Sequence, residues 1–95
     1  MDFEHPTLFI DVRTPAEYAD GHIAGTINIP HEQVTDIAEA IGDDKNRHVV
    51  LYCRSGGRVG MTIPYLLQLG YTNIENGGGV TDVALDLGVD IVRGG

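Results

Sequence analysis

The only cysteine of the chain, Cys53, begins a short run whose residue types suit the chemistry of a reactive thiolate. The run reads Cys53-Arg54-Ser55-Gly56-Gly57-Arg58-Val59 and directly follows a continuous apolar segment, Val49 to Tyr52. Two adjacent glycines let the backbone curl and turn its amides toward one point, which makes a concavity for an anion. Amide donors and nearby arginines stabilise a thiolate, so we expect the pKa of Cys53 to lie below its usual value.

A buried structural cysteine at the end of a strand is the plainer interpretation, because cysteine is among the most buried residue types. The combination of strand, cysteine, paired glycines, two arginines and a predicted helix start favours the reactive interpretation. Cys53 is therefore the candidate catalytic nucleophile. The candidate substrate-binding residues are Arg54, Ser55, Gly56, Gly57, Arg58 and Val59.

The spacing between cysteine and arginine discriminates between sulfur and phosphate chemistry. A phosphatase-like loop separates its cysteine from its arginine by five residues, so that the arginine can bind two oxygens of a tetrahedral anion. Only four residues separate Cys53 from Arg58, and Val59 holds the position that such an arginine would take. The smaller ring favours transfer of a sulfane sulfur over transfer of a phosphate.

Four apolar segments predict strands and alternate with helical patterns, which indicates an α/β fold with a mainly parallel sheet and helices on both faces. The predicted strands cover residues 8–12, 26–29, 48–53 and 71–75. Thr14 followed by Pro15 predicts a helix start, and apolar residues at 34, 37, 38 and 41 predict a helix that ends at Gly42. Ligands bind beyond the carboxyl ends of parallel strands, which is where Cys53 falls.

A helix is predicted over 58–69, with Ile63, Leu66 and Leu67 facing the core and Gly70 ending it. Pro64 cannot donate its amide, so we expect a kink or a loosened first half. The run Gly77-Gly78-Gly79 predicts a turn that lines the pocket, followed by a short helix over 80–87.

Taken together, these segments resemble the rhodanese (thiosulfate sulfurtransferase) superfamily, over about residues 9–79. The loop from Cys53 to Arg58 resembles its active-site loop. Three other segments agree in order and spacing: Asp11-Val12-Arg13 with Glu17-Tyr18, the stretch from Gly21 to Pro30, and Gly70-Tyr71. The length and Glu75-Asn76-Gly77-Gly78-Gly79 are similar to the single-domain, phage-shock type. The resemblance implies a rhodanese-like fold with a five-stranded, mainly parallel sheet, and a persulfide on Cys53 surrounded by loop amides.

The chain departs from the family in two places, and other polar residues receive a structural interpretation. Many members carry a tryptophan after the late Gly-Gly, whereas this chain has none, and Pro64 is unusual in the helix after the loop. Asp11 and Arg13 at the end of the first strand predict a structural ion pair or turn hydrogen bond. His22 in its Gly-His-Ile turn predicts a loop cap.

Size and charge bound the function. Residues 1–95 predict a single rhodanese-like domain, and the formal net charge of −8 disfavours nucleic acid and anionic membranes as partners. The resulting hypothesis is a soluble, monomeric sulfurtransferase enzyme that needs no cofactor or metal. Its donor is a small sulfur anion such as thiosulfate, and its acceptor is cyanide or a thiol, including a thiol protein. The alternative is a persulfide carrier with little turnover. A cytoplasmic location is expected, or a periplasmic one if a signal peptide has been removed.

Overall fold

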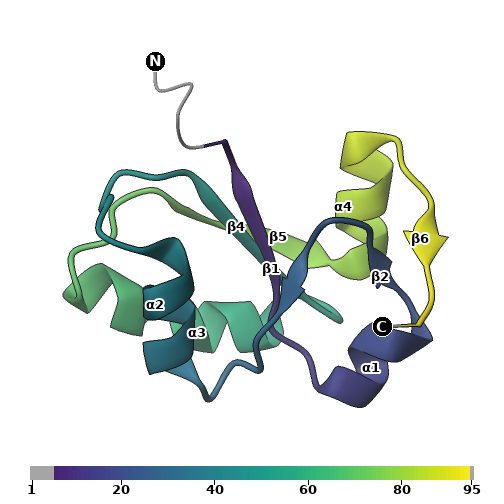
Figure 1. Cartoon of the computed structure of the whole chain (residues 1–95), viewed down its shortest axis with the longest axis horizontal. Coiled ribbons are helices and arrows are strands. Elements are labelled where there is room, and N and C mark those ends of the chain that lie inside the picture. Colours follow the sequence, from purple (N-terminus) through teal and green to yellow (C-terminus); the bar gives the residue numbers. More distant parts are fainter. Residues whose placement is uncertain (1–5, 95) are drawn as a thin grey trace.

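The computed structural model describes residues 6–94, and at its centre is a parallel β-sheet of four strands in the order β3-β1-β4-β5 (Figure 1). Two further short strands, β2 and β6, form a separate antiparallel pair. The elements in chain order are β1 (Leu8–Asp11), α1 (Pro15–Asp20), β2 (His22–Ile23), β3 (Ile27–Asn28), α2 (Val34–Ile41), β4 (Val49–Cys53), α3 (Gly57–Gln68), β5 (Ile74–Gly79), α4 (Val80–Leu87) and β6 (Ile91–Val92).

Strand β4 is buried along its whole length, because it lies between β1 and β5 and is covered on both faces. Its side chains alternate between two apolar clusters. Val49, Leu51 and Cys53 pack in the cluster that includes residues of α2 and α3, whereas Tyr52 packs with residues of α4. Figure 1 shows α2 and α3 on one side of the sheet and α4 on the other. The predicted α/β fold with a parallel sheet and helices on both faces is confirmed.

The number of strands in the central sheet differs from the expectation of five. After α1 the chain turns through β2, which pairs with β6 in the register His22↔Val92 and does not join the sheet. The edge strand β3 is short, because only Ile27 and Asn28 pair with β1. The central sheet therefore has four strands, and the antiparallel pair stands beside α1 and α4 (Figure 1).

The prediction of a glycine turn at residues 77–79 is wrong, because these glycines form the second half of β5. Close packing explains why glycine is found there. A Cβ atom on Gly77 would lie 2.8 Å from Val50 Cγ1 and 2.9 Å from Val83 Cγ2. The glycines therefore let α4 and β4 approach β5 more closely than any other residue would allow.

Helix α3 runs from Gly57 to Gln68 and is helical on both sides of Pro64, so the predicted loosened first half is not formed. Leu66 is fully buried and Ile63 packs against the core, as expected, but Leu67 is 53% exposed. That prediction is wrong because residue 67 lies about 100° around the helix from residue 66. The longest helix in residues 6–94 is α3, with 12 residues. None of the helices in this range is long and apolar enough to cross a membrane.

Candidate active site

The loop between β4 and α3 bends back on the cysteine that begins it. Cys53 is the last residue of β4, and the amide of Gly56 donates to Cys53 Sγ at 2.9 Å. Gly56 has a φ of +91°, in the left-handed region that glycine adopts without strain. Helix α3 starts at Gly57 with no side-chain cap, so the sulfur takes the place of a capping oxygen.

Opposing effects act on the pKa of Cys53. The residue is only 1% exposed, and this burial raises the pKa of the thiol. Backbone hydrogen bonds outweigh burial and lower the pKa below its usual value; the donors are the amides of Val59, Ser55, Gly56 and Arg58. The ring of amides expected from the sequence is therefore present, and it favours the thiolate.

Asn76 on β5 supports the loop from the neighbouring strand. Its Nδ2 donates to the carbonyl of Gly56 at 3.1 Å, and its Oδ1 accepts from the amide of Gly78 at 2.9 Å. Sequence reasoning missed this role. The only signal was an asparagine next to glycines, which is as typical of an ordinary turn.

Gly79, at the end of β5, faces the backbone of the loop. A Cβ atom there would overlap the carbonyl of Arg54. Contacts from β5 at Asn76 and at Gly79 thus support the loop from the strand next to β4.

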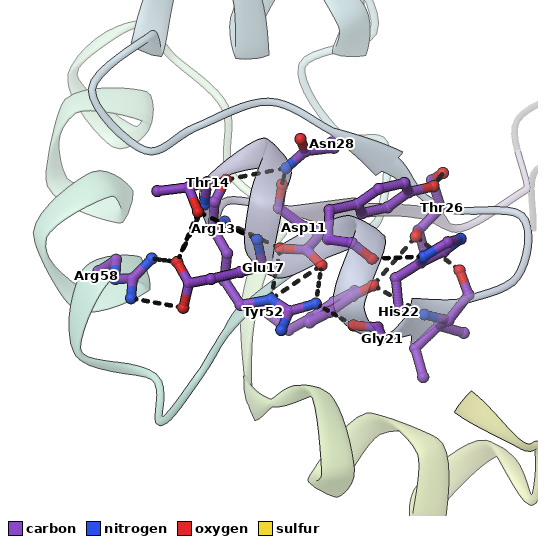
Figure 2. Close-up of polar contacts among 12 residues, drawn as sticks. Asp11, Arg13, Thr14, Glu17, Gly21, His22, Thr26, Asn28, Tyr52 and Arg58 are labelled. Carbon is purple, nitrogen blue, oxygen red and sulfur yellow. Dashed lines mark hydrogen bonds and ion pairs between the residues drawn. The ribbon is translucent and has the colours of Figure 1, made fainter. Parts of the chain in front are cut away.

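Arg58 reaches across to helix α1 (Figure 2). Its Nη1 donates to Glu17 Oε1 at 2.7 Å and its Nη2 donates to Glu17 Oε2 at 3.0 Å. Glu17 also closes the capping box of α1, because Thr14 Oγ1 accepts from the Glu17 amide and the Thr14 amide donates to the carboxylate. The hydrogen bonds of Arg58 are the main reason that the pKa of Glu17 falls to about 2. The ion pair fixes the loop to α1, and the carboxylate offsets the charge of Arg58.

The ion pair predicted between Asp11 and Arg13 is confirmed and is buried. Arg13 Nη2 lies 2.6 Å from Asp11 Oδ2, and the same nitrogen donates to the carbonyl of Gly21 at 2.5 Å. Asp11 is fully buried and Arg13 is 6% exposed. His22 also has the structural role expected of it, since its Nδ1 bonds the carbonyl of Tyr18 at 2.7 Å at the end of α1. These contacts, visible in Figure 2, hold the end of β1 against α1.

Arg54 differs from the other arginines at this edge of the sheet. It is exposed, and within residues 6–94 its side chain has no hydrogen-bond or ion-pair partner. It borders a hollow of about 450 Å³ lined also by Arg13, Glu17, Asp20, Val80 and Thr81. Cys53 is 1% exposed and is not among the residues that line this hollow, although the next residue, Arg54, is.

The fold and the site together define a small α/β protein in which a strand of a parallel sheet ends at a cysteine that accepts hydrogen bonds from loop amides. Residues 2–83 match the family model of the rhodanese-like domain, and the chain belongs to that family of sulfurtransferases. It is 40% identical over 77 residues to thiosulfate sulfurtransferase PspE of Escherichia coli, covering 81% of this chain and 74% of that protein.

Other similar proteins have different names and lengths. The chain is 35% identical over 83 residues to tRNA uridine(34) hydroxylase of Photorhabdus laumondii, but it spans only 24% of that protein. A solved structure described as rhodanese with anions from E. coli superposes with a TM-score of 0.80 at 40% identity, covering 94% of this chain and all of that one. The family resemblance deduced from the sequence is confirmed.

Proposed function

We propose that this protein transfers a sulfane sulfur from thiosulfate, or a similar donor, to a thiophilic acceptor through a persulfide on Cys53. One observation carries the proposal: backbone amides of four of the five loop residues from Ser55 to Val59 converge on a single sulfur. Donors in this arrangement stabilise negative charge on the sulfur before reaction and on the outer sulfur after it. The similarity to a thiosulfate sulfurtransferase supports thiosulfate as the donor.

The reaction is a double displacement at sulfur. The Cys53 thiolate attacks the outer sulfur of thiosulfate, the new S–S bond forms, and the electron pair of the old bond leaves with sulfite. An acceptor nucleophile then attacks the outer sulfur of the persulfide, and the electron pair of that bond returns to Cys53. Bonds and electron pairs balance in both steps without an oxidant, and the loop amides favour the thiolate by lowering the pKa of Cys53, so the first step needs no general base.

The two loop arginines have different parts in this proposal. Arg54 is exposed and has no partner in the described chain, so it attracts the donor dianion. Arg58 is held by Glu17 in two hydrogen bonds and acts on the site mainly through its backbone amide. Ser55, Gly56 and Val59 contribute amides, and Gly57 begins the helix that aims them.

The size of the ring favours sulfur over phosphorus. The amides that reach the sulfur come from residues 55, 56, 58 and 59, and Val59 is fully buried in the core. No arginine therefore stands where a phosphatase-like loop would need one to bind two phosphate oxygens. A persulfide adds only one atom to the cysteine, which this narrow ring accommodates.

The proposal is tested by treating the protein with thiosulfate and measuring the mass of the intact protein by mass spectrometry. An added mass of one sulfur on wild-type protein and none on Cys53→Ser is expected, with circular dichroism verifying that the variant is folded. Turnover is measured as thiocyanate formed from thiosulfate and cyanide. Rapid turnover identifies an enzyme, whereas persulfide without turnover identifies the alternative, a sulfur carrier. Thiocyanate production by Cys53→Ser at the wild-type rate would refute the proposal.

A further inference from the structure

Beside the candidate active-site loop, a surface hollow extends toward the C-terminal strand and is lined by two charged residues that the sulfur-transfer steps do not use, Asp20 and Arg93. Next to the hollow bordered by Arg54 is a second one, of about 600 Å³, which shares Arg13, Glu17, Asp20 and Val80 with it and is also lined by Arg93. We call the two together the α1 cleft. The volume of each hollow lies within the range of about 300–1,000 Å³ typical of small-molecule sites. Thiosulfate would fill only a small part of either hollow.

The cleft lies between segments that are distant in the sequence. Gly94 donates its amide to the carbonyl of Ala19 at 2.7 Å, and β6 pairs with β2, so the C-terminal strand is fixed beside α1. Figure 1 shows the chain running from β6 toward α1. The wall that carries Arg93 is therefore anchored to the element that carries Asp20.

The charges in the α1 cleft divide into satisfied and unsatisfied groups. Arg13 is paired with Asp11, and Glu17 is paired with Arg58. Arg54, Arg93 and Asp20 are exposed, and in the described part of the chain their side chains have no hydrogen-bond or ion-pair partner. Arg93 thus lines the larger hollow and Arg54 the smaller one, while the carboxylate of Asp20 lines both.

We infer that the α1 cleft binds the sulfur acceptor, and that the acceptor is a small peptide-like thiol carrying carboxylates and an ammonium group. The inference rests on the proposed function. Carboxylates pair with Arg54 and Arg93, and the ammonium group pairs with Asp20. The acceptor thiolate attacks the outer sulfur of the Cys53 persulfide; a new S–S bond forms on the acceptor, the bond to Cys53 breaks, and its electron pair restores the Cys53 thiolate. The acceptor's thiol proton goes to solvent.

The kinetic test uses protein preloaded with persulfide and freed of sulfite. The rate at which the persulfide loses its outer sulfur to an added thiol is followed by mass spectrometry. The two thiols are glutathione, which has two carboxylates and one ammonium group, and uncharged 2-mercaptoethanol. Each rate constant is corrected for the fraction of the thiol that is ionised. The ratio of the two rate constants should fall about threefold in Arg93→Ala and about tenfold in Arg93→Glu, more at low salt than at high salt. Arg47→Ala is the matched control, since Arg47 precedes β4 at the opposite end of the sheet. Equal ratios in wild type, the Arg93 variants and the control would overturn the inference.

Asp20→Asn tests the ammonium contact, because it should change the rate of sulfur transfer in opposite directions for two thiols. Discharge to glutathione should slow, whereas discharge to 3-mercaptopropionate, which has a carboxylate and no ammonium group, should accelerate because a repulsive charge is removed. Changes of the same sign for both thiols would contradict the assignment of Asp20.

A binding measurement separates this inference from the proposed function. S-methylglutathione cannot accept sulfur, so its binding to the unloaded protein, followed by amide NMR, does not depend on persulfide chemistry. Shifts at Asp20, Val80 and Arg93 that disappear in Arg93→Glu support the cleft even if no persulfide forms. Persulfide formation with no such shifts and no preference for glutathione would refute the cleft alone.

Discussion

Replacing Glu17 with glutamine removes the charge that holds Arg58 but keeps the shape of the side chain. Glutamine still serves at the third position of a capping box, so the start of α1 is retained. The loss therefore reports the ion pair between α1 and the active-site loop, whose nitrogen–oxygen distances are 2.7 and 3.0 Å.

The magnitude follows from the pKa of Glu17. Hydrogen bonds from Arg58, and secondarily from Thr14, lower the pKa from 4.5 to about 2, against an opposing effect of burial. That change corresponds to a ceiling of ~3.4 kcal/mol in the free energy of unfolding. Water screens the pair, because the side chains of Arg58 and Glu17 are 30% and 28% exposed, and the capping contact survives. We therefore expect Glu17→Gln to cost ~1–2 kcal/mol at pH 7.

The pH dependence gives the sign of the effect. The folded-state pKa is depressed, so the stabilisation is fully present above pH 4.5 and is lost as the pH falls toward 2. Urea unfolding followed by circular dichroism, at a series of pH values from 7 to 2.5, should show the wild type and Glu17→Gln converging in acid. Glu39→Gln is the control, since Glu39 is exposed on α2 and has no side-chain partner in residues 6–94.

Two results would refute this reasoning. One is a difference between wild type and Glu17→Gln that is as large at pH 3 as at pH 7. The other is a double-mutant cycle with Arg58→Ala in which the two losses simply add, because a direct pair should show a coupling of about 1 kcal/mol.

Gly56→Ala should cost about 1–2 kcal/mol in the free energy of unfolding, because alanine is strained in the left-handed conformation of Gly56. It should also raise the midpoint of the pH–rate profile for thiosulfate, because the strained loop moves the residue 56 amide away from Cys53. An unshifted midpoint would contradict the amide ring. Arg54→Ala should slow persulfide loading at low ionic strength, because only repulsion between the anionic donor and the acidic chain remains. Added salt should then speed loading of the variant, whereas it slows loading of the wild type. The same dependence on salt in both proteins would remove Arg54 from donor capture. Leu66→Ala should lower the free energy of unfolding by about 2–4 kcal/mol, because Leu66 is fully buried, whereas Leu67→Ala should change it by no more than about 0.5 kcal/mol, because Leu67 is exposed. Both are measured by urea unfolding. Equal losses would contradict the orientation of the helix.

Local patterns were sufficient to predict the loop of amides around the candidate nucleophile. The apolar run of β4 indicated a buried central strand, and the residues after it indicated a loop of amides at a helix start. Thr14 and Pro15 indicated the start of α1, where a capping box is found. Each of these features depends on neighbours within a few residues, so sequence spacing is enough to define it.

Features that depend on distant contacts could not be predicted in this way. Arg58 and Glu17 are 41 residues apart, and their pairing requires α1 and α3 to meet at the same sheet edge. Asn76 is 20 residues from Gly56, and its contact depends on the register of β5 beside β4. The glycines of β5 predict a turn by local preference, but tertiary packing against Val50 and Val83 places them in a strand.

Electrostatics at the active edge are local, even though the chain carries a formal net charge of −8. Arg13 and Arg58 are each offset by a carboxylate within hydrogen-bonding distance, so they add little field of their own. Surface carboxylates farther than about 8 Å are screened at physiological salt, whereas backbone amides act on the sulfur at contact. Because amides carry no titratable charge, the positive potential of the ring does not change with pH. Loss of activity in acid should therefore follow protonation of Cys53 itself and not the titration of a neighbouring base.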